Sequence, residues 1–206
     1  MLEWIKGHFN KLHQLQLNTT VTDREGKNIG LADGFEHYIE AALATRERHG
    51  KIMFVGNGGS AGIASHLAID HSKNGQLPSM AFSDASAITC LSNDYGYEHV
   101  FSKQIEYHGR KDDLLVAISS SGKSVNILNA VAAARKLGCR VITLAGFDRA
   151  NPLNKLGDAN FYVDSKEYGF VEVSHLALGH SMLDYIIETQ DQASESEHHA
   201  LLAAVE

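Results

Sequence analysis

From residue 51 onward, short apolar runs rich in β-branched residues alternate with longer segments whose apolar positions recur at helical spacing. Such runs predict buried strands, and their alternation with helices is typical of an α/β fold with a parallel sheet. We therefore expect a single α/β domain with a parallel five-stranded sheet flanked by helices. The predicted strands cover residues 51–55, 79–83, 114–119, 140–145 and 160–163.

Helical spacing also predicts the elements around these strands. Two amphipathic helices, 2–16 and 33–48, precede the sheet; a polar stretch at 18–28 separates them, and we expect them to cover the sheet or pair with another subunit. The later predicted helices run from 60 past 70, 98–108, 125–137 and 172–188. We divide the chain into an N-terminal helical segment (1–50), the α/β domain (51–190) and a polar C-terminal tail (191–206).

Two predicted strands are each followed directly by a loop that opens a predicted helix. One loop is Gly56-Asn57-Gly58-Gly59-Ser60, and the other runs from Ser119 to Ser124. Glycine lets backbone N–H groups approach an anion, a helix start adds partial positive charge, and serine hydroxyls donate hydrogen bonds. In an open parallel sheet, loops at the carboxyl ends of the strands bind ligands. Together the loops predict a phosphate cradle for a small phosphorylated ligand.

The glycine loop also allows other interpretations. Gly56, Gly58 and Ala61 satisfy a relaxed dinucleotide fingerprint, and Asp84 follows the next strand roughly where a ribose-binding carboxylate belongs. Two features argue against a dinucleotide site: the second, serine-rich loop and the lack of residues for a separate substrate domain. We therefore expect no nucleotide cofactor. A P-loop would need glycine in place of Ala117. Both loops could also be tight strand-to-helix turns.

Composition and charge narrow the expected partners. The 206 residues carry a formal net charge of −7, whereas nucleic-acid binding needs clustered Lys and Arg, so no nucleic acid is expected. No apolar run is long enough to span a bilayer, and residues 1–6 do not begin a signal peptide, so we expect no membrane and a cytoplasmic location. Cys90 and Cys139 lie in apolar contexts and are expected to be reduced core thiols.

Four residues on two predicted helices have the spacing of an acid–base or metal site. His66 and Asp70, four apart, share a face of the helix after the glycine loop. Glu172 and His180, eight apart, share a face of the last helix. Two imidazoles and two carboxylates suffice for a divalent metal ion, and zinc is the usual occupant. Alone, the His66–Asp70 pair could equally be a helix-stabilising contact.

Several segments in this order resemble the sugar isomerase (SIS) domain of phosphoheptose isomerases. They are the glycine loop, Ser83-Asp84-Ala85-Ser86, Asn93-Asp94-Tyr95-Gly96, Val100-Phe101-Ser102 and Ile118 to Ser124. The resemblance covers residues 51–188 and implies a flavodoxin-like sheet and a homotetramer with sites formed between subunits. It also implies aldose–ketose isomerisation of sedoheptulose 7-phosphate to D-glycero-D-manno-heptose 7-phosphate, which proceeds through an enediolate.

The resemblance also implies roles for individual residues. Asp70 corresponds to the base and His180 to its acid partner, while His66, Asp70, Glu172 and His180 match a quartet that binds zinc in some members. With the two loops, it gives the expected substrate-binding residues, which are Asn57, Gly58, Ser60, Asp94, Ser119, Ser120, Ser121, Ser124 and Glu172.

Four places depart from the family pattern. Asp70 replaces Glu, Glu172 replaces Gln, Asn74 replaces Arg, and Gly169-Phe170 replaces an Asp-Arg pair. The last two departures remove side chains that help to hold the sugar in the family. A second interpretation therefore stays open: a non-catalytic SIS module that binds a sugar phosphate and regulates a partner protein.

Overall fold

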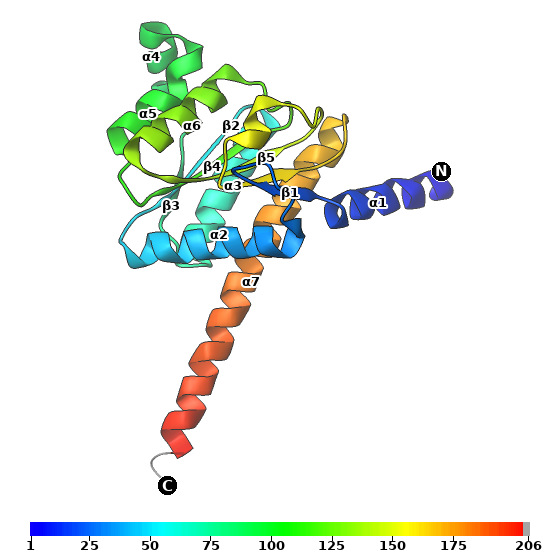
Figure 1. Cartoon of the computed structure of the whole chain (residues 1–206), viewed down its shortest axis with the longest axis vertical. Helices are drawn as coiled ribbons and strands as arrows, with labels where there is room; N and C mark the ends of the chain where they lie inside the picture. Colours follow the sequence, from blue (N-terminus) through cyan, green and yellow to red (C-terminus); the bar gives the residue numbers. More distant parts are fainter. Residues whose placement is uncertain (204–206) are drawn as a thin grey trace.

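The computed structural model describes the backbone of residues 1–203 and the side chains of residues 1–190. Within this range one sheet has the strand order β1-β6-β5-β4-β2-β3 (Figure 1). Its strands are β1 (Thr20–Asp23), β2 (Ile52–Gly56), β3 (Ser79–Ala81), β4 (Leu114–Ser119), β5 (Arg140–Ala145) and β6 (Ala159–Tyr162). Strands β2 to β6 are parallel, and β1 pairs antiparallel with β6. The predicted α/β sheet is confirmed, with one edge strand more than expected.

Helices cover both faces of the sheet. They are α1 (Leu2–Leu17), α2 (Gly30–Glu47), α3 (Gly59–Lys73), α4 (Ala85–Tyr95), α5 (Val100–His108), α6 (Val125–Leu137) and α7 (Tyr168–Ala203), with short 3-10 helices η1 (Tyr97–His99) and η2 (Pro152–Lys155). Helices α2, α3 and α7 lie on one face, and α4, α5 and α6 on the other (Figure 1). Side chains alternate between the two faces along a strand. Phe54 of β2 therefore packs on the face covered by α2, α3 and α7, and Val55 on the face covered by α4, α5 and α6.

The strand order reverses next to β2, which positions the loops. The chain leaves β2 for β3 on one side and returns to β4 on the other, so β2 and β4 are parallel neighbours. Gly56 pairs in register with Ile118, and each of the two loops begins at this point. Ligands of open α/β sheets bind where the strand order reverses. The fold therefore brings the glycine and serine loops together.

Two elements were not predicted. The stretch 18–28, expected to be only a polar connection, contains β1, where the buried side chain of Val21 packs against Gly34 of α2. Helix α4 begins after Asp84, whose carboxylate accepts a hydrogen bond from Ala87 N at 2.8 Å. Asp84 thus caps a helix, which accounts for its place after β3 without a ribose.

The C-terminal part of the chain also differs from the prediction. Helix α7 continues to Ala203 instead of ending at residue 188, because residues 189–203 contain no Gly or Pro and many good helix formers. Residues 204–206 of the predicted tail lie outside the described part, and the division of the chain at residues 50 and 190 stays a prediction. Cys139 is buried as expected, but Cys90 is exposed on α4. No helix among the described residues is long and apolar enough to cross a membrane.

Candidate active site

The loops after β2 and β4 line one cavity of about 240 Å³ at the carboxyl edge of the sheet. Eight of the nine residues expected to bind substrate lie along it, and Gly59 and Tyr168 complete the wall. The eight are Asn57, Gly58, Ser60, Ser119, Ser120, Ser121, Ser124 and Glu172. None of these ten lining residues is Lys or Arg, so an anion here would be bound by N–H groups, hydroxyls and a helix start. We call this cavity the cradle.

The glycine loop has a backbone that larger residues would not adopt. Gly58 lies at φ 55° and ψ −122°, and a side chain on Gly56 would collide with the backbone of Ser60. Helix α3 starts directly afterwards at Gly59, and the first N–H groups of a helix have no intrahelical acceptor. The loop therefore presents the N-terminus of α3 to the cradle.

An amide pair ties the two loops together. Asn57 of the glycine loop and Asn126, in the first turn of α6, exchange two side-chain hydrogen bonds of 2.9 Å each. The Tyr97 hydroxyl donates a third bond to Asn57 Oδ1, also at 2.9 Å. Asn126 is buried, and α6 directly follows the serine loop. The Asn57 side chain thus positions the loops, a role that sequence reasoning did not give it.

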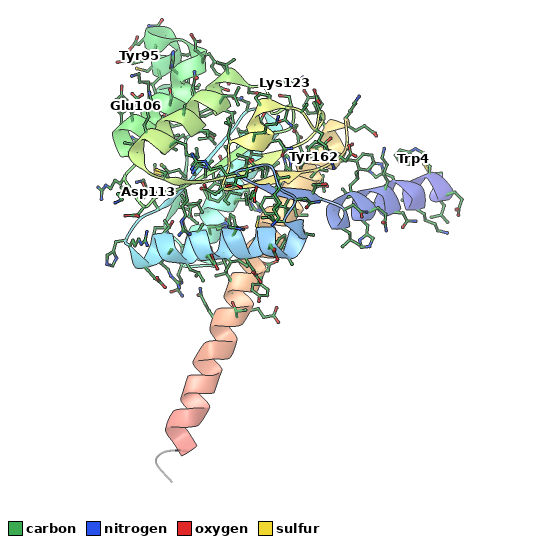
Figure 2. The ribbon with its side chains drawn as sticks, viewed as in Figure 1. Trp4, Tyr95, Glu106, Asp113, Lys123 and Tyr162 are labelled. Carbon is green, nitrogen blue, oxygen red and sulfur yellow. The ribbon has the colours of Figure 1, made fainter. Side chains whose placement is uncertain are left out.

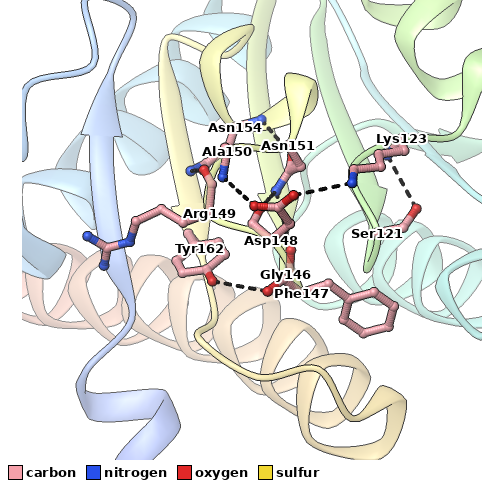
Figure 3. A network of polar contacts seen from close by, with 10 residues as sticks. All are labelled: Ser121, Lys123, Gly146, Phe147, Asp148, Arg149, Ala150, Asn151, Asn154 and Tyr162. Atoms are coloured by element: carbon pink, nitrogen blue, oxygen red, sulfur yellow. Dashed lines mark hydrogen bonds and ion pairs between the residues drawn. The ribbon is translucent and has the colours of Figure 1, made fainter.

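The serine loop is held by its own hydroxyls and by the segment after β5. Ser119 Oγ accepts from Gly122 N at 3.2 Å, and Ser121 Oγ accepts from Lys123 N at 3.2 Å. Lys123 Nζ lies 3.2 Å from Asp148, and the backbone N–H of Ala150 together with Lys123 holds the pKa of Asp148 below its ordinary value (Figure 3). The lysine of this loop is therefore engaged away from the cradle, while the buried hydroxyl of Ser120 has no partner in the structure.

A second cluster lies further along the same helix. Asp70 Oδ2 is 3.3 Å from His66 Nε2 and 3.8 Å from His180 Nδ1, and the two imidazole centroids are 5.1 Å apart. The Asp70 carboxylate is largely buried, whereas the His66 ring is about half exposed. Helices α3 and α7 supply the cluster, and they come close where Gly179 meets Leu67. Three of the four residues expected as metal ligands are thus brought together.

The cluster has the donor set of a metal site. One ligand atom from each of His66, Asp70 and His180 lies within 4.8 Å of the others. Two imidazoles and one carboxylate, with a further position open, are typical of catalytic zinc sites. Glu172 is outside this group, because both of its carboxylate oxygens lie against Gly59 at the start of α3. The residues present fit a divalent metal ion.

Comparisons with known proteins show which family has this arrangement. Residues 30–146 match the SIS domain family. The phosphoheptose isomerase of Rhodospirillum rubrum is 42% identical over 161 residues, which cover 74% of this chain and 85% of the relative. The chain belongs to the phosphoheptose isomerase family.

Further comparisons extend over nearly the whole of other phosphoheptose isomerases. That of Aliarcobacter butzleri is 37% identical over 162 residues, covering 76% of this chain and 85% of the relative. The structure of phosphoheptose isomerase GmhA from Neisseria gonorrhoeae superposes with a TM-score of 0.75 at 33% identity, covering 90% of this chain and 98% of that one. The similarity thus includes both helices that carry the cluster.

One residue that was expected to bind substrate lies away from the cradle. Asp94 is exposed on α4 and does not line the cradle. Its carboxylate accepts from Asn93 Nδ2 at 2.9 Å, and Cys90 Sγ lies 3.7 Å away. Asp94 is therefore not placed to contact a ligand in the cradle of the same chain.

Two of the departures from the phosphoheptose isomerase pattern lie at helix ends. Asn74 directly follows α3, and its backbone N–H donates to Asp70 O at 2.8 Å. Phe170 is buried; its ring centroid lies 4.5 Å from that of His8 and 4.6 Å from Lys11 Nζ, both on α1. Phe170 thus anchors α1 to the start of α7.

Two buried histidines near the site are structural. His71 Nδ1–H donates to Leu67 O at 2.7 Å, so Nε2 accepts from the Tyr38 hydroxyl at 2.5 Å. His175 Nε2–H donates to Ala145 O at 3.1 Å, and its Nδ1 has no partner. Burial lowers the pKa of each imidazole from 6.5 to about 4. Both are neutral at pH 7, and they link α3 and α7 to the rest of the core.

Proposed function

We propose that this protein is a sugar-phosphate isomerase that converts sedoheptulose 7-phosphate to D-glycero-D-manno-heptose 7-phosphate. One observation carries the proposal: α3 begins in the cradle at Gly59 and also carries His66 and Asp70 of the cluster, which His180 of α7 completes. His66 and Asp70 follow Gly59 by seven and eleven residues, about 10 and 16 Å at 1.5 Å per residue. An open-chain sugar bound by its phosphate in the cradle would extend along α3 toward the cluster, with the phosphate at the end opposite the reacting carbons.

The reaction moves two protons and leaves no net change in electrons. Asp70 takes a proton from C1 of the ketose and returns it to C2, while His180 carries a proton from the C1 hydroxyl to the C2 oxygen. The intermediate is an enediolate, whose negative charge needs nearby donors. The largely buried carboxylate of Asp70, between two imidazoles, supports its role as base. The cradle holds the phosphate and so orients the carbon chain.

A divalent metal ion completes this proposal. His66, Asp70 and His180 would hold it, and we propose zinc because two imidazoles and a carboxylate suit it. When bound, such an ion acts as a Lewis acid on the substrate oxygens. Glu172 would join these ligands only if its side chain left Gly59.

We also propose that the enzyme is a homotetramer with sites formed between subunits. Helix α1 projects from the body with Trp4 at its outer end, and none of its residues is buried (Figure 2). Trp4 is 69% and Phe9 63% exposed, which is unusual for large apolar side chains that remain in water. The exposed Asp94 would in this arrangement reach a cradle of a neighbouring subunit.

A direct assay tests the function. The protein is supplied with zinc and incubated in parallel with a heptulose 7-phosphate, a hexulose 6-phosphate and a pentulose 5-phosphate. Formation of the aldose is followed in each reaction. We expect turnover with the heptulose phosphate and much less with the shorter sugars. Absence of turnover with all three, together with tight binding of one of them, would instead support the non-catalytic SIS module.

A further inference from the structure

The carboxylate of Glu172 lies in the cradle, beside Gly59. A Cβ atom on Gly59 would collide with both of its carboxylate oxygens, so the carboxylate lies directly on the first residue of α3. The same side chain lines the cavity beside the serine loop. Helix N-termini attract carboxylates as well as phosphates. An anionic group of the chain itself therefore lies within the cavity that is predicted to bind the phosphate.

The described residues that line the cradle include no Lys or Arg to offset this charge. Lys123 of the serine loop is 3.2 Å from Asp148. Neither the glycine loop nor the serine loop has a side chain hydrogen-bonded to the Glu172 carboxylate in the structure. A phosphate entering the cradle would meet a carboxylate at close range, and like charges at such distances repel strongly.

We propose that Glu172 competes internally with the phosphate of the ligand and so sets the affinity and charge selectivity of the cradle. This inference rests on the proposed function. The phosphate binds by displacing the carboxylate from Gly59, and the side chain rotates away on α7. The Glu172 carboxylate weakens the binding of a dianion more than it weakens the binding of a ligand whose group in the cradle carries one negative charge.

Calorimetric titration with inorganic phosphate tests this proposal. It is carried out on the protein as purified and again after dialysis against a chelator. Glu172→Gln keeps the shape and removes the charge, and we expect it to bind phosphate ~10-fold tighter or more. Glu172→Ala should also bind phosphate more tightly than the wild type. Because Ala donates no hydrogen bond, this variant separates the loss of repulsion from a new hydrogen bond donated by Gln.

Glu167→Gln is the matched control. Glu167 immediately precedes α7, five residues before Glu172, but its carboxylate pairs with Lys11 of α1 and does not line the cradle. We expect its phosphate affinity to equal that of the wild type. Unchanged or weaker binding by Glu172→Gln, in an enzyme that still isomerises its substrate, overturns the internal competition alone. If no variant binds phosphate and no sugar phosphate is turned over, the proposed function fails as well.

Discussion

The backbone of Gly179 lies so close to the side chain of Leu67 that a Cβ atom on Gly179 would come within 2.5 Å of Leu67 Cδ1. Leu67 is buried on α3 and Gly179 is on α7, so the contact sets the distance between the two helices. Each is the chain neighbour of a cluster histidine, His66 or His180. The absence of a side chain at Gly179 thus lets the two imidazoles come together.

Gly179→Ala is expected to push α7 away from α3. Overpacking of a buried contact typically costs about 1–3 kcal/mol, and a displacement on the order of 1 Å can lower a rate about 100-fold. We expect weaker zinc binding and a large fall in kcat, measured by metal titration and by initial rates. Gly169→Ala is the control, because Gly169 is on the same helix and has open space around it. Equal effects of the two substitutions would contradict a specific role for the Gly179–Leu67 contact.

Asn126→Ala is expected to loosen the glycine loop. It removes both hydrogen bonds to Asn57 and leaves the partly buried Asn57 Nδ2 without its acceptor, which costs roughly 1–3 kcal/mol of stability. Because the loops then no longer hold the phosphate together, KM should rise more than kcat falls. Asn129→Ala on the same helix removes a bond to Glu98 O and touches neither loop. If both variants lose stability but neither changes KM, Asn126 does not position the cradle.

His175 predicts a pH dependence of stability. Its pKa is about 4 in the folded protein against 6.5 for the ordinary imidazole, so the unfolded chain binds the proton more readily. The contribution of His175 to the free energy of unfolding is fully present above pH 6.5 and is lost as the pH falls toward 4. Between these values the free energy of unfolding falls by about 1.4 kcal/mol per pH unit. Urea unfolding from pH 7 to pH 5 measures it.

The variant His175→Gln separates His175 from other titrating groups. Gln can still donate to Ala145 O but does not titrate. We expect a lower free energy of unfolding at pH 7 and a shallower fall toward pH 5 than in the wild type. An identical pH slope in both proteins would show that His175 does not contribute.

The exposed apolar residues of α1 predict an interface. Replacing Trp4 and Phe9 together by Glu places charges where apolar contact is expected and should shift the sedimentation profile from a tetramer to smaller species. Asn10→Glu, on the same exposed helix, should leave the profile unchanged. A wild-type protein that sediments as a monomer at all concentrations would contradict the proposed assembly.

Much of the fold follows from local patterns. The runs that became β2 and β4 are nearly continuous and apolar, and those of β5 and β6 are mostly apolar, because both faces of a parallel strand inside the sheet are buried. Strand β1 escaped detection because it has four residues and a single buried one, Val21. Helix α4 was missed because only Leu91 is buried in it, so its apolar spacing is weak.

The site was predictable in part, for a different reason. His66 and Asp70 share a helix face, so their proximity follows from spacing alone. The position of Glu172 depends on how α7 packs against the start of α3, which no spacing within one helix specifies. Asn126 looked like an ordinary polar helix residue, and its only signal was its place directly after the serine loop.

The most direct test of the account is proton exchange with the solvent, followed by NMR in D₂O with sedoheptulose 7-phosphate as substrate. The wild type should form the aldose and incorporate deuterium at the carbons between which Asp70 moves the proton. Asp70→Asn should lose both aldose formation and deuterium uptake by a factor of about 10²–10⁴ while still binding inorganic phosphate like the wild type. Undiminished exchange and aldose formation by Asp70→Asn would contradict the assignment of Asp70 as the base of this isomerase.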